Sequence, residues 1–219
     1  WVIEDHFPLG RPPFVEAQVQ MVEDVMPYEL MKLRLLNASH QGLAYFGRLS
    51  NYTYVHEVMQ DPLITKLLVR YMDEEATPTL LPVPGVDLAK YKAQLIERFS
   101  NPEVLDTVAR LAAESSDRIP KWLVPVIREQ LKNNGQVKLS AAIVASWARY
   151  DEGIDEKGEA INVVDPLKDE LMAIAKTQKA NPKAFIENRK LFGDLAQDSH
   201  FAEPYLNTLK LLQIGRAHV

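Results

Sequence analysis

The sequence predicts a mainly α-helical domain that is preceded by a short β-containing segment. Apolar residues recur at helical spacing along most of the chain after Pro27. Short stretches rich in Pro, Asn, Asp and Gly separate these periodic runs, as expected between packed helices. Before Pro27 the pattern changes, because Trp1-Val-Ile3 and the alternating run from Val19 to Val22 have the character of strands.

The N-terminal segment is predicted as a unit of its own, residues 1–25. Gly10-Arg-Pro-Pro13 is a loop between the two strand-like runs. Pro27 suits the first turn of a helix, and an apolar helical pattern continues from Leu30 to about Leu49. We therefore place a boundary near residue 25 and a helical domain over residues 26–213.

Further helices are marked off by residues that start or end them. Asp61-Pro62 and Asn101-Pro102 each open a helix, and Asn133-Asn-Gly135 closes one with a left-handed cap. Three prolines make residues 77–85 an extended loop, and the acidic residues 151–164 read as an exposed loop. After 30–49, the predicted helices are 52–58, 63–73, 87–99, 103–114, 121–133, 139–150, 165–177, 182–191 and 198–212.

Composition excludes several classes of function. The chain has 219 residues, a net charge of −5, 47% hydrophobic residues and no cysteine, so disulfides and thiol catalysis are excluded. Such a chain fits a reducing compartment, and we expect a cytoplasmic protein. The mildly acidic balance gives no footprint for nucleic acid, and no run of eighteen apolar residues predicts a membrane span. The histidines lack His-x-His or His-Glu-x-x-His spacing, so no metal is expected.

Three polar residues of different chemistry interrupt the helical run at 30–49. They are Lys32, Asn37 and His40, at spacings of five and three. At roughly 100° per residue, Asn37 lies about 140° from Lys32 with His40 between them, so all three leave one half of the helix. A base, an amide and an imidazole in one space suit removal of a hydroxyl proton. Spacing alone leaves a packing role open, because buried Asn and His are usually bound by backbone groups.

The pattern Lys32-x4-Asn37-x2-His40 resembles the signature of the polyol-specific long-chain dehydrogenases. Other segments follow the order of that family over nearly the whole chain, which is more specific than one motif. They are Trp1 to Phe7, Gly10-Arg-Pro12, Asp24-Val25, Tyr28-Glu29, Leu35 to Ala44, His56-Glu57, Asp61-Pro62, Asp73 to Thr79 and Ile119 to Pro125.

The resemblance implies the substrate-binding, C-terminal domain of a two-domain dehydrogenase. Its activity would be interconversion of a polyol and a ketose, D-mannitol and D-fructose, with hydride passing to or from NAD and without a metal. Lys32 would be the general base, Asn37 would polarise the reacting oxygen, and His40 would orient the hydroxyl. An amine that acts as a base near neutral pH needs a pKa about 3 units below the usual 10.4, which burial and nearby cations can provide.

The resemblance also implies a partner domain. No Gly-x-Gly-x-x-Gly turn stands in the sequence, so we expect a missing N-terminal nucleotide-binding domain and an inactive chain on its own. NAD and NADP remain open, because that domain decides between them. Residues 214–219 have no counterpart in the family and are expected to be a non-native tail, with a native tail as the alternative.

Three charged residues join the candidate site. Glu29, three residues before Lys32, is either a proton relay to solvent or an ordinary helix ion pair worth about 0.2–0.5 kcal/mol. The stretch Val108 to Pro120 resembles the substrate-contacting stretch of the family, in which Arg110 matches an arginine and Arg118 stands where a lysine is expected. Either arginine could instead be solvated on the surface.

Two rival functions remain. A fructuronate or tagaturonate reductase of the same family would use an arginine such as Arg118 to clamp a substrate carboxylate. A non-catalytic helical interaction domain would bury the three polar residues for packing alone.

Overall fold

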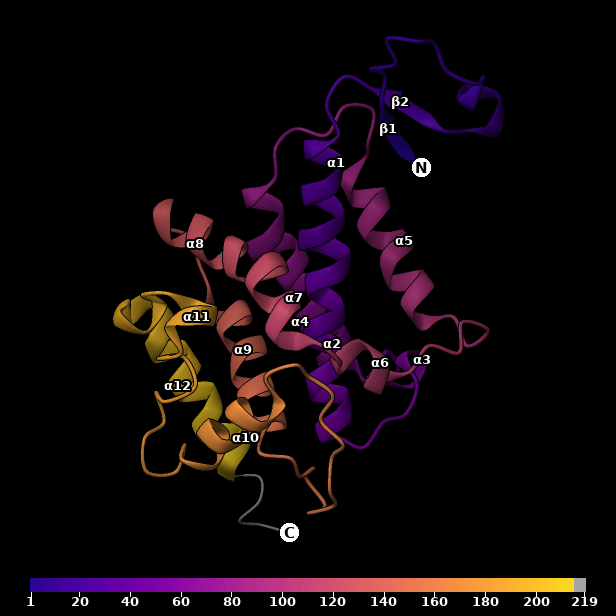
Figure 1. Cartoon of the computed structure of the whole chain (residues 1–219). Coiled ribbons are helices and arrows are strands. Elements are labelled where there is room, and N and C mark those ends of the chain that lie inside the picture. The colour runs from indigo at the N-terminus through magenta and orange to yellow at the C-terminus, as the bar shows by residue number, and fades with distance from the viewer. Residues whose placement is uncertain (215–219) are drawn as a thin grey trace.

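The computed structural model describes residues 1–214 and confirms the mainly helical fold. Strand β1 (Val2–Glu4) pairs in parallel with β2 (Gln20–Val22), and the 3₁₀ helix η1 (Phe14–Ala17) lies between them. Figure 1 shows this small sheet projecting from one end of the helical body. The predicted non-native tail falls almost wholly on residues 215–219, which lie outside the described part of the chain.

One long helix runs through the centre of the helical body (Figure 1). It consists of α1 (Met26–Met31), a π-helical turn η2 (Lys32–Asn37) and α2 (Ala38–Leu49). The helix was predicted at 30–49, whereas its π turn was not. At the end of η2 the Ala38 amide donates to the Leu33 carbonyl, five residues back, which is the hydrogen bond that defines a π turn.

A second π turn follows the helix predicted at 63–73. That helix is α4 (Pro62–Arg70), and it continues into η3 (Tyr71–Ala76), also π-helical. The Asp61 carboxylate caps α4, accepting from the Leu63 and Ile64 amides at 2.8 and 3.4 Å. The 3₁₀ turn η4 (Thr77–Thr79) and a loop lead to α5 (Leu88–Ser100).

Two predicted helices start later in the structure. The helix predicted at 103–114 is only α6 (Val108–Ala112), and the one at 52–58 is only α3 (Val55–Val58). Residues Tyr54 and Thr107 form an isolated antiparallel bridge just before these helices, which keeps both approaches extended. The Thr107 hydroxyl then caps α6 by accepting from the Arg110 amide at 3.3 Å.

Two other predictions were wrong in their bounds. In place of one helix at 121–133 there are α7 (Ser115–Trp122) and α8 (Val124–Lys132), because Pro120 lies inside α7 rather than before a helix. The predicted helix 182–191 is reduced to α11 (Arg189–Phe192), which starts where the Asn188 side chain accepts from the Lys190 amide.

The core is built around α9 (Lys138–Tyr150), which is buried along most of its length. It packs against α2 and against α12 (Ser199–Ile214) (Figure 1). Trp147 on α9 meets Phe185 edge to face, with ring centroids 5.0 Å apart, and stacks on Tyr45 of α2 at 6.2 Å. The remaining elements are α10 (Lys168–Lys176) and the 3₁₀ turn η5 (Leu195–Gln197).

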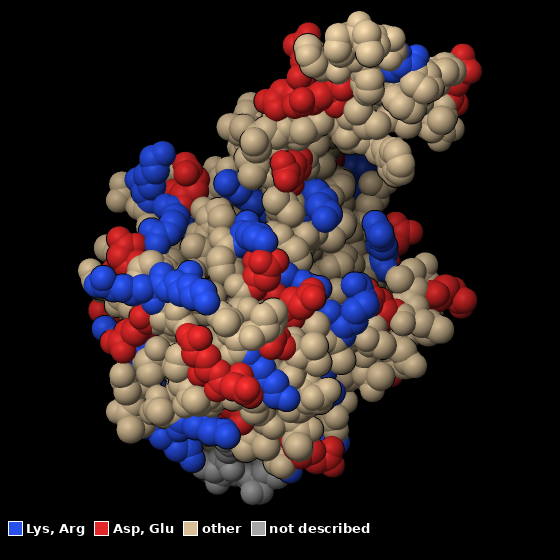
Figure 2. All heavy atoms as spheres, viewed as in Figure 1, with Lys and Arg blue, Asp and Glu red and all other residues tan. Residues whose placement is uncertain are grey.

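The surface carries charges of both signs. Figure 2 shows basic and acidic residues interspersed over the visible face, without a uniformly basic area. Over residues 1–214, none of the helices has the length and apolar character needed to cross a membrane.

Candidate active site

The π turn η2 holds two of the three predicted catalytic residues at its ends. Lys32 is its first residue and Asn37 its last. A π turn, closed by a hydrogen bond from residue i+5 to residue i, contains more residues per turn than an α-helix, so each residue rotates the chain by less than 100°. The five residues from Lys32 to Asn37 therefore come closer to one full turn. The angle between Lys32 and Asn37 is therefore smaller than the 140° expected for a regular α-helix.

The side chains of the three predicted catalytic residues differ in exposure, but none of them has a hydrogen-bond or ion-pair partner in the described part of the chain. Asn37 is 7% exposed, His40 is half-buried and Lys32 is exposed. Within residues 1–214, no side-chain hydrogen bond or ion pair engages the Lys32 amine, the Asn37 amide or the His40 imidazole. Asn37 has little exposed surface, and its amide is free to bind a partner from outside the chain.

His40 lines a small cavity of about 110 Å³. Its ring packs on Phe99 of α5, with centroids 4.5 Å apart, and Arg110 and Asp106 line the same cavity. Burial lowers the pKa of His40 from 6.5 to about 4, with the Asp106 carboxylate opposing the shift and the cations Arg110, Arg98 and Lys32 adding to it. His40 is therefore a neutral imidazole at neutral pH, able to exchange hydrogen bonds with a hydroxyl. Lys32 and Asn37 are not among the lining residues of this cavity.

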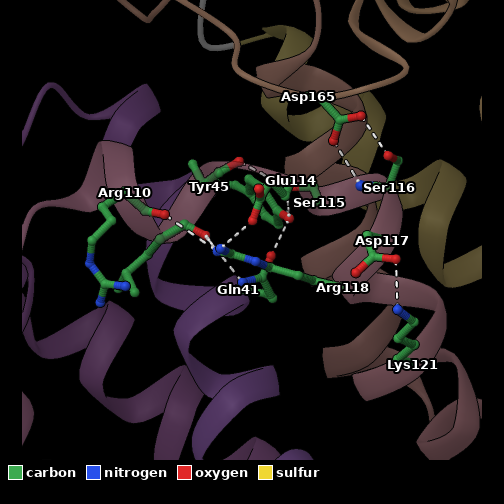
Figure 3. A network of polar contacts seen from close by, with 12 residues as sticks. Gln41, Tyr45, Arg110, Glu114, Ser115, Ser116, Asp117, Arg118, Lys121 and Asp165 are labelled. Atoms are coloured by element: carbon green, nitrogen blue, oxygen red, sulfur yellow. Dashed lines mark hydrogen bonds and ion pairs between the residues drawn. The ribbon is translucent and has the colours of Figure 1, made fainter.

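Arg110 reaches the cavity but is already held by a carboxylate. Its Nε donates to Asp106 Oδ1 at 2.6 Å, and its Nη2 donates to the other oxygen of the same carboxylate. The Arg110 guanidinium is the main cause that lowers the pKa of Asp106. Figure 3 shows the Arg110 guanidinium pointing away from Arg118, so the guanidinium groups of the two predicted substrate-binding arginines do not meet in this chain.

Arg118 braces the end of α6. Its Nη1 donates to the carbonyls of Arg110 and Leu111 at 3.3 and 3.1 Å, and its Nη2 pairs with Glu114 at 2.9 Å (Figure 3). The guanidinium also lies 5.6 Å from the centroid of the Trp122 ring. Both terminal nitrogens of Arg118 are thus engaged within the chain.

A buried polar network connects this brace to the central helix. Gln41, next to His40, donates to the same Leu111 carbonyl at 3.2 Å, and its side-chain oxygen accepts from Tyr45 at 2.6 Å. The Tyr45 hydroxyl also lies 2.6 Å from the Ser115 hydroxyl (Figure 3). Sequence reasoning missed Gln41 and Tyr45. The signal in the sequence was their separation by four residues, which places both on one face of the helix.

Glu29 is exposed, and no ion pair joins it to Lys32 in the described part of the chain. Over residues 1–214, no three His, Cys, Asp or Glu side chains are arranged so that they could hold a metal ion together. The start of α1 also lacks the features of a dinucleotide-binding turn. The passage from β2 into α1 carries Glu23 and Asp24 and no glycine, so it would repel a pyrophosphate.

Comparison with known proteins identifies relatives over nearly the whole chain. Residues 24–213 match the family of mannitol dehydrogenase C-terminal domains. The chain is 46% identical over 200 residues to mannitol dehydrogenase DSF1 of Saccharomyces cerevisiae, covering 91% of this chain and 40% of that protein. It is 39% identical over 216 residues to mannitol 2-dehydrogenase of Aspergillus terreus, covering 97% of this chain and 43% of that protein.

Solved structures agree with these matches. The structure of Pseudomonas fluorescens mannitol 2-dehydrogenase with NAD and D-mannitol superposes with a TM-score of 0.93 at 35% identity, covering 99% of this chain and 44% of that one. A D-sorbitol dehydrogenase in substrate-free form superposes with a TM-score of 0.89 at 28% identity, covering 99% of this chain and 45% of that one. The chain thus spans about two fifths of the length of the curated relatives it matches.

Proposed function

We propose a function from the premise that this chain belongs to the mannitol dehydrogenase C-terminal domain family. Its relatives are oxidoreductases named for mannitol, and one was solved with NAD and D-mannitol. We infer that this chain supplies the polyol-binding and proton-removing part of an NAD-dependent dehydrogenase that interconverts D-mannitol and D-fructose. NADP is the alternative to NAD, because the residue beside the ribose decides between them and we assign that residue to the nucleotide-binding domain.

One observation carries the proposal. The signature residues Lys32, Asn37 and His40 have no side-chain partners in the described part of the chain, whereas the neighbouring arginines are paired. Groups held only for packing would be expected to satisfy one another or the backbone. Free donors and acceptors on one helix are instead suited to a ligand with several hydroxyl groups, which favours the dehydrogenase over a non-catalytic interaction domain.

The proposed chemistry moves one proton within this chain. The Lys32 amine takes the hydroxyl proton of the reacting carbon, and the Asn37 amide donates to the oxygen as negative charge develops on it. The neutral His40 imidazole holds the same or an adjacent hydroxyl and fixes its direction. NAD supplies the hydride acceptor in the whole enzyme, and we assign its binding to residues outside this chain.

Lys32 needs a drier environment than this chain provides. Because its side chain is exposed here, substrate and a nucleotide-binding domain would have to cover it in the whole enzyme. Glu29 is exposed one helical turn away and would then pass the proton to solvent. Replacement of Glu29 by Gln in the whole enzyme tests this relay, because an unchanged pH–rate profile would remove it.

The arginines bear on the substrate. We propose that Arg110, held by Asp106 beside the His40 cavity, contacts a substrate hydroxyl, and that Arg118 contributes a further contact. A hexuronate would place its carboxylate on a guanidinium, and at Arg118 it would compete with Glu114, which already pairs with Nη2. We therefore prefer a neutral polyol, the substrate in the names of the relatives, to fructuronate or tagaturonate. Turnover of the whole enzyme with fructose and fructuronate in parallel separates the two, and a preference for fructuronate would overturn the assignment.

Replacement of Lys32 by Ala in the whole enzyme tests the catalytic role. Turnover should fall at least about 100-fold, because the general base is lost. Lys66→Ala is the matched control, since Lys66 is also an exposed helical lysine and lies on α4. Turnover of the Lys32 variant close to that of the Lys66 variant would remove Lys32 from the role of base.

A further inference from the structure

The two π turns of the domain lie against each other and are linked by a reciprocal pair of hydrogen bonds. The Tyr71 hydroxyl, on the first residue of η3, donates to the Arg34 carbonyl in the middle of η2 at 3.1 Å. In return, the Arg34 guanidinium donates to the Thr79 carbonyl, just beyond η3, at 2.5 Å. Neither bond is required by the regular geometry of a helix.

A π turn needs support of this kind. The π-helix is rare and occurs mostly as single turns within α-helices, where its wider turn leaves carbonyl groups less well paired than an α-turn does. The Arg34 carbonyl lies inside η2, between Lys32 and Asn37. A hydroxyl that donates to this carbonyl from outside the helix stabilises the wider turn, because it satisfies an acceptor that the π turn leaves poorly paired.

The support on the η3 side is itself fixed. Tyr71 is fully buried, and the Thr77 hydroxyl binds the Met72 carbonyl at 2.6 Å. The Glu75 carboxylate, 1% exposed, accepts from the amides of Leu139 and Ser140 at the start of α9, at 2.7 and 2.8 Å. Tyr71 therefore projects from a segment that is anchored to the core helix α9. If η2 changed to an α-helical turn, Tyr71 could move little with it.

From this geometry we infer that Tyr71 is a positioning residue, which holds η2 as a π turn and so sets the placement of Lys32 relative to Asn37. Tyr71 touches no reacting group in this assignment and acts through the Arg34 carbonyl. The inference rests on the proposed function, because it gives the π turn a purpose only if Lys32 and Asn37 act on one substrate oxygen.

The test compares Tyr71→Phe with Tyr205→Phe in the whole enzyme. The first change removes only the hydroxyl that binds η2. The second removes an equally buried hydroxyl that binds Gln178 at 3.2 Å, on α12. Hydrogen exchange of the amides at 33–39 reports on the π turn, while kcat and KM for the polyol report on its use.

We expect exchange at 33–39 to be at least about 10-fold faster in Tyr71→Phe, with kcat lowered about 10-fold and KM changed less than about 2-fold. Tyr205→Phe should leave all three as in the wild type. Arg34→Lys, which keeps the charge but loses the fork that reaches Thr79, should reproduce the exchange effect from the other side of the brace.

Two outcomes overturn the inference. Unchanged exchange in both Tyr71→Phe and Arg34→Lys would mean that the brace does not hold η2. Faster exchange with wild-type kcat would mean that the π turn does not serve catalysis. Failure of the proposed function is recognised separately, by wild-type turnover of Lys32→Ala, and the exchange measurement remains valid in that case.

Discussion

Acid should destabilise this protein through His40 in a defined pH window. The pKa of His40 is lowered from 6.5 to about 4, chiefly because the half-buried imidazole loses solvation between Leu36, Phe99 and Val104. Above pH 6.5 the imidazole is neutral in both the folded and the unfolded state, so its lowered pKa in the folded state does not reduce the unfolding free energy. That stability is lost as pH falls toward 4, because the unfolded state binds the proton first.

The size of the effect follows from the shift. A difference of about 2.5 pKa units corresponds to about 3 kcal/mol of unfolding free energy, lost between pH 6.5 and 4. Carboxyl groups also titrate over part of this range, so the wild type must be compared with a variant that lacks the imidazole. His40→Gln removes the titrating group and retains a polar side chain of similar length.

The assay is urea unfolding of both proteins at pH 7.5, 6.5, 5.5, 4.5 and 4.0. The wild type should lose about 3 kcal/mol more than His40→Gln between the ends of this series. A proton NMR titration of the His40 ring should give its midpoint near 4. Parallel loss of stability in the two proteins, or a ring that titrates near 6.5, would refute the burial argument and the neutral imidazole at the site.

Two further predictions concern packing and capping. Glu75→Gln should lower the unfolding free energy by about 1–3 kcal/mol in urea, because an amide cannot accept from both the Leu139 and Ser140 amides as the carboxylate does. The control Glu74→Gln, which removes an exposed carboxylate paired with Arg70, should leave the urea midpoint close to that of the wild type. Gly47→Ala should cost about 1–3 kcal/mol, because the added Cβ would lie 2.7 Å from a Val58 methyl carbon. In a double-mutant cycle Val58→Ala should recover part of that loss, and strict additivity would contradict the proposed clash.

Much of the fold could be predicted because helical periodicity and helix starts are local properties. The start of α4 after Asp61 and the extent of α9 follow from neighbouring residues alone. The errors occurred where a distant partner decides. The late start of α6 depends on the bridge between Tyr54 and Thr107, which are remote in sequence. The start of α7 at Ser115, six residues before the predicted helix at 121–133, follows a left-handed residue at Glu114 that the local pattern does not mark.

The candidate site shows the same division. Lys32, Asn37 and His40 could be selected from their types and spacing together with the resemblance, and their roles remain predictions. The π turn between the first two could not be predicted, because so short a π-helical segment barely disturbs the apolar pattern. Nor could the pairing of Arg110 with Asp106 or of Arg118 with backbone carbonyls, since many acceptors are equally plausible before the chain is folded.

The π turn also affects how this helix tolerates changes in length. A π turn accommodates one residue more than an α-turn in an otherwise continuous helix. Deleting one residue between Lys32 and Asn37 would therefore restore a regular α-helix while α1 and α2 keep their neighbours. The spacing of Lys32 and Asn37 would change and the scaffold would not. Loss of a single codon at this place is thus a route by which a descendant protein could acquire a different arrangement of these two side chains on an unaltered fold.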